Sequence, residues 1–433
     1  MEQNNQDIMT EKQFITNNCT KQTYINQIIL SFFDMDYATT IEFNTNVIAT
    51  QALCYLLNFI QEHNPDLVRK ISPPLFTNCS TKLVLANHTL RQLNIIDDNT
   101  YSKSSGHLSS VLNFLNRSST TMGKRKFRYQ LLNPTFDDDT LNIEYEVIDY
   151  ILQKNNLYVP QVRKEMNHIR DIDKINRQLV AKKLNPSTLY SLYKTVGTIK
   201  DIHKTFINDD DVLHKYLLTK SNNSTYQIND IVANFMKFIE TNFHIQNCQY
   251  LNSTVTFDKN IIQSNVCPTL DSLINKELCI NNDILTMQSY FNGLIKFVEK
   301  PAKETEYIKI HETDKTGISF HLTKKRSLIL KKILASKTSL EILIISDQIK
   351  IPIKDIRIES VGTNDQLVFP YLINATRTLI DTQKKITDTI YTIYFSLIQS
   401  IEDQWYDKLE YIASYISYYD VIINKAYIAR EYN

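Results

Sequence analysis

The chain has 433 residues, of which 42% are hydrophobic and 22% are charged, and its formal net charge is +1 at pH 7. This composition supports a substantial core and excludes a disordered or collagen-like protein. At roughly 100–200 residues per domain, the length allows about two to four domains. No uninterrupted apolar run approaches the roughly 20 residues of a membrane-spanning helix, which excludes a membrane-embedded protein.

The spacing of glycine, cysteine and histidine excludes several kinds of site. The six glycines never form G-x-x-x-x-G-K-[ST] or G-x-G-x-x-G, so we expect no nucleotide-binding loop and no catalysis by this chain. The cysteines form no C-x-x-C pair and the histidines have no zinc-ligand spacing, so we expect no metal site. Residues 1–12 are polar and lack the apolar stretch of a secretory signal, which favours an intracellular protein.

Helical periodicity dominates, because long segments contain neither glycine nor proline. In the first part of the chain, loops are expected at Pro268 and within the Asn-rich stretch 208–229. The acidic runs 137–139 and 209–211 precede apolar helical patterns. We interpret both runs as helix N-caps rather than as metal ligands.

Residues 112–134 combine a polar turn with a cationic helix. Gly123 permits close approach of another backbone. The helix is expected to end before Pro134, since the residue preceding a proline avoids the helical conformation. The turn residues are Asn116, Ser118, Ser119 and Thr120, and the cations that open the helix are Lys124, Arg125, Lys126 and Arg128.

Between residues 304 and 355, short runs rich in β-branched residues alternate with polar ones. Residues 307–311 and 318–323 flank a polar turn that contains Gly317, and residues 340–353 are rich in isoleucine. These patterns predict short antiparallel strands. Residues 321–354 also carry an excess of six positive charges, which attracts phosphate groups. The alternative interpretation is a solvated charged surface on a small lobe.

The segment from residue 370 to the last residue, 433, contains neither glycine nor proline beyond Pro370, and its apolar residues predict one long helix packed on another. An ordinary helical bundle is the alternative interpretation. The predicted seam consists of Leu372, Leu379, Ile386 and Ile393 at intervals of seven, with Ile390 and Leu397 on the same face.

The segment L-N-F-L-N-R-S-S-T-T-M-G-K-R-K-F-R-Y-Q-L-L-N-P at residues 112–134 closely resembles a signature of the MutS family of DNA mismatch-repair ATPases. That signature reads N-R-T-x-T-x-M-G-K-R-x-L-R-x-W-L-x-x-P, and its usual Trp is Gln130 in this chain. The matching residues are Asn116, Arg117, Thr120, Met122, Gly123, Lys124, Arg125, Arg128, Leu131 and Pro134.

Four further segments resemble the family in its own order, namely residues 83–95, 169–192, 308–323 and 418–433. Within the third, Gly317 occupies a family glycine position and His321 replaces a family Glu. The resemblance implies that the cations of residues 124–128 form ion pairs within the chain or pack against neighbouring domains.

The resemblance implies a mainly α fold, a long helical lever bundle with an inserted small β-rich clamp lobe. Residues 1–97 would form the end of a connector domain and the entry to the lever. Residues 98–284 would form the first part of the lever. Residues 285–358 would form the clamp lobe and residues 359–433 the returning part of the lever.

The same resemblance implies that the lobe contacts the backbone of double-stranded DNA without sequence specificity. The chain ends where the family's ATPase domain begins, so ATP, Mg²⁺ and homo- or hetero-dimerisation are expected only through such a C-terminal domain, and no small-molecule substrate is expected. The triplet 297–299 (F-V-E) is not expected to act as the family's mismatch wedge. The predicted DNA-binding residues are Lys309, Lys315, His321, Lys324, Lys325, Arg326, Lys331 and Lys332.

Three alternatives to a mismatch-repair lever and clamp stay open, and one of them is an ATP-hydrolysing enzyme in the form of a longer polypeptide. A family relative without the wedge domain would act on branched recombination intermediates. A helical structural or interaction protein would have lost DNA binding and would capture a partner instead.

Overall fold

The computed structural model describes residues 18–33, 43, 45–63, 65–68, 71–74, 81–83, 85–96, 108–207, 211–221, 227–257, 259–298, 306–313, 317–336, 338–343 and 348–432. The chain forms two compact units. The helical unit comprises Met1–Thr241, Ile245–Thr254 and Leu397–Asn433, and the lobe unit comprises Asn242–His244 and Val255–Ser396. Helices predominate among the described residues and the strands form small antiparallel sheets, which confirms the mainly α fold with a small β lobe.

Short helices build most of the helical unit, and polar caps define several of their starts. The side chains of Thr120, Asp137, Asp171 and Asn185 each accept a hydrogen bond from a backbone N–H three residues further on, which satisfies a donor that the helix itself leaves free. The N-cap interpretation is therefore confirmed for Asp137, whereas Asp211 precedes the helix Val212–Lys220 without a side-chain cap hydrogen bond. The helices are α2 (Gln22–Phe33), α4 (Val47–His63), α5 (Pro65–Val68), α6 (Asn87–Gln92), α7 (Val111–Leu115), α8 (Thr121–Leu132), α9 (Asp138–Gln153), α10 (Tyr158–Met166), α11 (Ile172–Val180), α12 (Pro186–Phe206), α13 (Val212–Lys220), α14 (Ile228–Asn242) and α15 (Ile245–Cys248).

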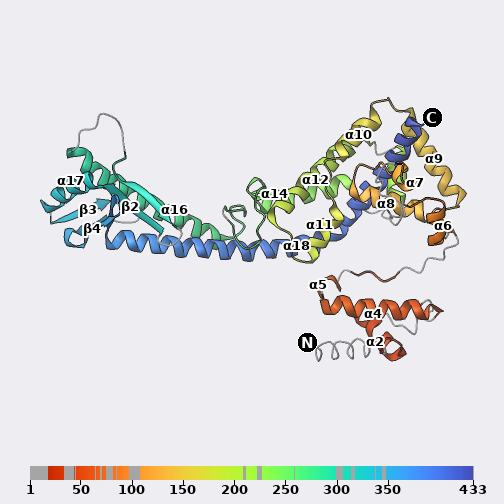
Figure 1. Cartoon of the computed structure of the whole chain (residues 1–433), viewed down its shortest axis with the longest axis horizontal. Coiled ribbons are helices and arrows are strands. Elements are labelled where there is room, and N and C mark those ends of the chain that lie inside the picture. The colour runs from red at the N-terminus through yellow and green to blue at the C-terminus, as the bar shows by residue number, and fades with distance from the viewer. Residues whose placement is uncertain are drawn as a thin grey trace. The chain divides into compact units, whose positions relative to one another are not determined.

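Helix α18 (Pro370–Glu431) is 62 residues long, which confirms the predicted long helix. Figure 1 shows it in blue as one uninterrupted helix. At 1.5 Å per residue, its length is about 90 Å. Its residues up to Ser396 belong to the lobe unit, and those from Leu397 belong to the helical unit.

The buried stripe of α18 departs from the predicted seam after Ile386. Leu372, Leu379 and Ile386 are buried at the predicted interval of seven, but Ile393 is only half-buried. Burial then continues in steps of four, at Ile390, Tyr394 and Ile398. A straight helix has 3.6 residues per turn, so a strict seven-residue repeat rotates away from the contact face.

The lobe unit contains a four-stranded antiparallel sheet in the order β1-β2-β6-β5 and a separate β3–β4 hairpin. Phe320 of β2 pairs with Leu367 of β6, and Leu367 pairs with Ile358 of β5, so these apolar side chains line one face of the sheet. They join one core with Leu330 and Phe291 from the helices. The elements are α16 (Pro268–Val298), β1 (Lys309–Thr313), β2 (Gly317–Thr323), α17 (Lys324–Ala335), β3 (Ser339–Leu343), β4 (Gln348–Pro352), the 3₁₀ turn η2 (Ile353–Asp355), β5 (Arg357–Val361) and β6 (Asn364–Val368).

Two parts of the lobe differ from the sequence expectation. Residues 324–335 form the helix α17 between two strands, because Ser327, Leu330 and Leu334 recur at helical spacing and are buried. The strands β5 and β6 extend the sheet to Val368, so the predicted lobe boundary at residue 358 falls inside a strand. Their hairpin turns at Gly362, whose φ of +65° suits the first position of a two-residue turn.

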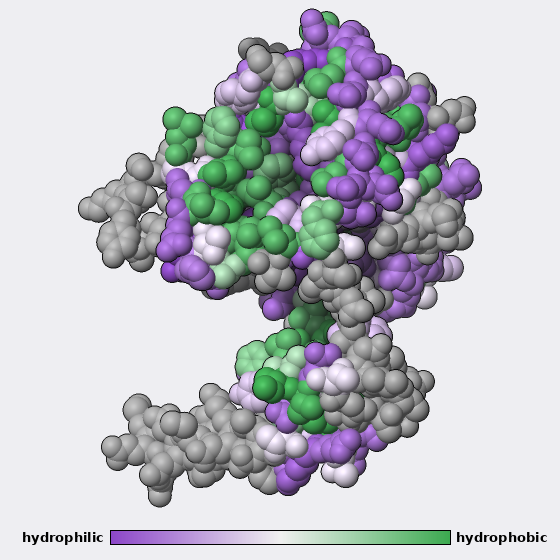
Figure 2. Space-filling view, turned by 90° about the vertical axis from the view of Figure 1, so that its right-hand side faces the viewer, coloured by the Kyte–Doolittle hydropathy of each residue, from purple (hydrophilic) through white to green (hydrophobic). Residues whose placement is uncertain are grey.

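Hydropathy alone does not mark a functional surface. Large apolar side chains such as Ile143 and Tyr145 of α9 are exposed, and Figure 2 shows hydrophobic residues beside hydrophilic ones on the face that it presents. Such mixing is ordinary for a folded protein. Among the described helices, none combines the length and the hydropathy that crossing a bilayer requires.

Candidate nucleic-acid interface

Four lysines lie on one exposed face of α17. Lys324 and Lys325 are in its first turn, and Lys331 and Lys332 follow seven residues later on the same side, about 10 Å further along the axis. The opposite side of the helix is buried against the core through Leu330 and Leu334. No carboxylate of a described residue lies within ion-pair distance of Lys324, Lys331 or Lys332. This face is therefore a concentrated positive surface.

Arg326 differs from the four lysines, although it is in the same helix. Its guanidinium lies 4.7 Å from the centroid of the Tyr307 ring, and the residue is half-buried. One of its nitrogens also lies 3.4 Å from the Tyr307 carbonyl oxygen. Arg326 thus anchors the start of α17 to the chain before β1 by a cation–π contact.

The predicted residues Lys309 and His321 lie on the face of the four-stranded sheet that points away from the lobe core. They are directly opposed in the β1–β2 pairing, and successive side chains of a strand point to opposite faces. His321 is adjacent to Phe320 and Leu322, which point into the core. The structure therefore separates the predicted DNA-binding residues into the α17 lysines and a second group on the sheet. Lys315 lies outside the described residues.

His321 is a poor source of positive charge. Its Nε2 lies 3.0 Å from the Ser319 hydroxyl oxygen, and its ring centroid lies 4.9 Å from that of His311. Burial lowers the pKa of His321, and the neighbouring His311 lowers it further. Both effects favour the neutral imidazole, so this side chain contributes less positive charge than an unperturbed histidine.

Two other lobe cations are Lys350 and Lys354. Lys350 of β4 pairs with Glu341 of β3, with 3.2 Å between the ammonium nitrogen and a carboxylate oxygen. Lys354 is exposed in η2. The excess charge of this segment is therefore distributed unevenly, and the α17 face carries most of it among the described residues.

The signature loop before α8 is built around Asp420, in a distant part of the chain. The Asp420 carboxylate accepts hydrogen bonds from the backbone N–H groups of Ser119 and Thr120, at 2.9 and 2.7 Å. It also accepts one from the Thr120 hydroxyl at 2.8 Å. That hydroxyl in turn accepts the backbone N–H of Gly123 and so caps α8. The turn is thus fixed onto helix α18.

Asn424 of α18, one turn beyond Asp420, fixes the chain before this loop. Its side-chain oxygen accepts the backbone N–H of Arg117 at 3.1 Å, and its side-chain nitrogen donates to the Leu115 carbonyl at 3.0 Å. The Asn116 side chain donates to the carbonyl of Lys124 at 2.9 Å. The Asn-Arg pair of the signature therefore has a structural role.

The other signature residues have varied surroundings. Met122 is buried. Arg125 forms ion pairs with Asp171 and Asp173, at 2.7 and 2.6 Å, which confirms the predicted ion pairing within the chain at this position. Lys124 and Arg128 are exposed, and the carbonyl of Pro134 accepts the backbone N–H of Leu83. Gly317, the signature residue of the lobe, has a φ of +67°.

Comparison with known proteins identifies the family. A sequence profile of MutS domain III matches residues 88–426, which is most of the chain. The chain belongs to the MutS family. A mutS homolog of Acanthamoeba polyphaga mimivirus, named as a DNA mismatch repair protein, is 24% identical over 96% of this chain and 38% of its own length. The DNA mismatch repair protein MutS of Clostridioides difficile is 20% identical over 98% of this chain and 40% of its own length.

A shorter match has a higher sequence identity. The mitochondrial DNA mismatch repair protein mutS homolog of Sarcophyton glaucum is 30% identical over 31% of this chain and 13% of its own length. This chain thus spans about two fifths of the length of the relatives that it matches along nearly its whole sequence. Within it, residues 88–426 correspond to MutS domain III.

The signature is visible in the sequence, but the residues that hold it in place are not. Asp420 and Asn424 lie about 300 residues from the loop that they bind. Both are fully buried polar residues in a helix, and residues 418–433 resemble the family segment that closes the lever. The signal present in the sequence was a pair of polar residues one helical turn apart within an apolar pattern, and polar residues on a buried helix face require hydrogen-bond partners elsewhere.

Proposed function

We propose that this chain is the DNA-binding lever and clamp region of a MutS-family mismatch-repair protein, and that the four exposed lysines of α17 contact the backbone of duplex DNA. The observation that supports this proposal is the position of Lys324, Lys325, Lys331 and Lys332 on one face, opposite the apolar side of the helix. Lysine–phosphate contacts supply affinity without sequence information, as a clamp on arbitrary sequences requires.

The local backbone adds to this attraction. The first turn of α17 contains Lys324, Lys325 and Arg326 and no acidic residue. Cations at a helix N-terminus oppose the helix dipole, at a cost of roughly 0.3–1 kcal/mol each. A bound phosphate relieves this repulsion, because it interacts favourably both with the cations and with the free N–H groups of the first turn.

We assign to α18 the transmission of the clamp lobe's position. A continuous helix transmits displacement as a rigid rod, and α18 has residues in both units. Its receiver would be an ATPase domain in the complete protein, and this chain itself would not hydrolyse ATP. The DNA substrate is a mismatched duplex, and the duplex backbone is the feature that the lobe contacts.

The test replaces Lys324, Lys325, Lys331 and Lys332 with Gln and measures affinity for mismatched, matched and four-way-junction DNA between about 50 and 300 mM salt. Each lost phosphate contact reduces the slope of log K against log salt by about 0.9, so four contacts predict a reduction of about three to four. Arg326 is left in place because it packs on Tyr307.

The matched control replaces four exposed lysines of the helical unit, Lys200, Lys204, Lys215 and Lys237, with Gln. Its salt slope should equal that of the wild type. An unchanged slope in the α17 variant, with thermal unfolding also unchanged, contradicts the assignment. A preference for four-way junctions over mismatched duplexes would instead indicate a family member acting on branched intermediates.

A further inference from the structure

A cleft in the helical unit combines positive charge with an apolar lining. Its volume is about 440 Å³, within the usual size range of small-molecule sites. It lies between α8, α9, α13 and α18, beside the short segment 81–83. It shares no residue with the α17 surface, so its ligand is a separate question from DNA binding by the lobe. The apolar part of the lining includes Phe127, Leu131, Pro134 and Leu141.

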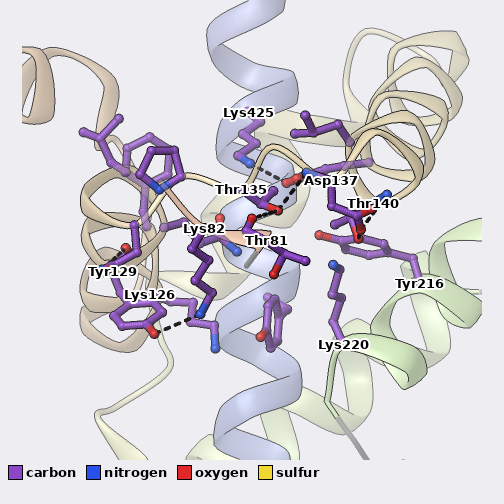
Figure 3. Close-up of a pocket in the computed structure, with 18 residues that line it drawn as sticks. Thr81, Lys82, Lys126, Tyr129, Thr135, Asp137, Thr140, Tyr216, Lys220 and Lys425 are labelled. Carbon is purple, nitrogen blue, oxygen red and sulfur yellow. Dashed lines mark hydrogen bonds and ion pairs between the residues drawn. The ribbon is translucent and has the colours of Figure 1, made fainter. Parts of the chain in front are cut away.

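Three lysines extend into this cleft from different elements. Lys82 and Lys126 come from one side, and Lys220 of α13 comes from the opposite side (Figure 3). All three are half-buried. A half-buried ammonium group interacts with a nearby charge more strongly than a fully hydrated one, so three of them around one space attract negative charge.

Aromatic rings, rather than carboxylates, accompany these three lysines. The ammonium nitrogens of Lys82, Lys126 and Lys220 lie 5.2, 3.9 and 5.9 Å from the ring centroids of Tyr129, Tyr418 and Tyr216, respectively. Lys82 also donates to the Tyr129 hydroxyl at 3.2 Å. No described carboxylate lies within ion-pair distance of any of the three lysines. Cation–π contacts position these groups while leaving their net charge in place.

The acidic residues of the lining are already engaged. Glu144 pairs with Lys425, and Asp137 caps α9 through the backbone N–H and the hydroxyl of Thr140. Neither carboxylate forms an ion pair with any of the three lysines. The lining contains four lysines and two carboxylates, so the cleft keeps a net positive charge.

An unsatisfied amide lies in the same cleft. The Oε1 atom of Gln130 is inaccessible to solvent and has no hydrogen-bond partner among the described residues. Oxygen and nitrogen of a Gln amide are exchanged by a simple flip, so this group suits either a ring N–H or a phosphate oxygen of a ligand. A buried polar atom without a partner is costly, and a rotation of the Gln130 side chain would bring it to a ligand in the cleft that supplies the partner.

We propose that this cleft binds a nucleoside di- or triphosphate. The phosphate groups would occupy the space between Lys82, Lys126 and Lys220, because several anionic oxygens on one small molecule match several cations on different walls. The base would lie on the apolar lining beside Phe127, and the Gln130 amide would bond to its edge. This site uses side chains of distant segments and requires no Gly-rich loop.

The experiment measures binding of ATP to the full chain in magnesium-free buffer at low salt, by equilibrium dialysis. ATP should bind saturably, inorganic tripolyphosphate should compete with it, and adenosine should bind at least tenfold more weakly. The triple variant K82Q/K126Q/K220Q should raise the Kd for ATP at least tenfold, and Gln130→Ala should raise it about threefold. The charge-preserving variant K82R/K126R/K220R should keep ATP binding within about threefold of the wild type.

The control is the K324Q/K325Q/K331Q/K332Q variant, which should bind ATP as the wild type does. The proposal is overturned if ATP does not bind saturably or if the triple Gln variant binds it unchanged. It is also overturned if adenosine binds as tightly as ATP. If the triple variant loses duplex DNA binding and DNA displaces ATP, the cleft is part of a polynucleotide path and the nucleotide assignment is wrong. Should the Gln variant fail to fold, the Arg variant and competition by tripolyphosphate still decide the question.

Discussion

At the scale of single residues, the signature loop depends on one buried carboxylate. Asp420 is fully buried, and that burial raises its pKa, although its hydrogen bonds to Ser119 and Thr120 oppose the shift. The carboxylate lies so close to α8 that a Cβ at position 123 would be 2.1 Å from its Oδ2 atom. The glycine of the signature is therefore required by the distance between two helices.

The first prediction concerns this contact. Gly123→Ala forces the loop away from Asp420, and overpacking of this kind costs roughly 1–3 kcal/mol of unfolding free energy. Gly293→Ala is the control, since Gly293 lies exposed within α16 and no atom is within 4 Å of the position that an added methyl group would take. That change should stabilise the protein by about 0.5–1 kcal/mol. Urea unfolding measures both, and equal effects of the two substitutions would contradict the role of Asp420.

The second prediction concerns pH. The folded state holds the pKa of His321 below its ordinary value of 6.5, so the unfolded chain binds the proton more tightly. The stability from this group is present above pH 6.5 and is lost as pH falls through the folded pKa. His321→Gln should therefore reduce the fall in melting temperature between about pH 7.5 and pH 5. The exposed residue His168 provides the control as His168→Gln, and an equal fall in wild type and His321→Gln would refute the prediction.

At the scale of elements, strand β2 begins at a close contact with helix α18. Gly317 has a φ of +67°, and a Cβ there would lie 2.3 Å from the Thr376 methyl group. The Thr376 hydroxyl donates to the carbonyl of Ile318 at 3.1 Å. Gly317 therefore meets two requirements at once, a left-handed backbone and space for the helix.

The third prediction separates these two requirements. Gly362 has a similar φ of +65°, but nothing lies within 4 Å of its Cβ position. Gly362→Ala should cost only the backbone strain, about 1–2 kcal/mol. Gly317→Ala should cost that strain plus a steric clash of roughly 1–3 kcal/mol. Thermal unfolding compares the two variants, and a smaller loss at position 317 than at position 362 would exclude the close packing.

The sequence predicted the elements whose patterns are local. The alternation in residues 307–323 and 340–353 indicated β1 to β4, and the absence of helix breakers after Pro370 indicated α18. Strands β5 and β6 were not predicted, because they are mostly polar. Their pairing depends on Leu367, which meets Phe320 across the sheet.

The candidate site was predicted by charge and not by geometry. Counting lysines and arginines identified the α17 segment, because local net charge is visible in sequence. It did not distinguish Lys331, on the exposed face, from Arg326, which packs on Tyr307. Nor did it separate Lys309 from the lysines of α17, since the register of β1 on β2 and the packing of α17 are long-range properties.

At the scale of the whole molecule, α18 contributes long stretches to both units. Its buried stripe follows the 3.6-residue period of a straight helix rather than the 3.5-residue period of a supercoil. The proposed relay requires that this helix be continuous near Ser396 and Leu397, where the assignment to units changes.

The last prediction tests this continuity with Thr392→Pro. Thr392 is exposed, so no core contact is removed, but proline deletes a backbone hydrogen bond and clashes with the carbonyl of Asp388, at a cost of about 3 kcal/mol or more. Hydrogen exchange should become faster over about one turn on each side of residue 392. Thr392→Ala, which loses only the hydroxyl bond to the Asp388 carbonyl, should retain wild-type protection. DNA affinity should be unchanged in both variants, because the α17 face is intact. Unchanged hydrogen exchange in the proline variant would show that α18 is not a rigid rod near residue 392.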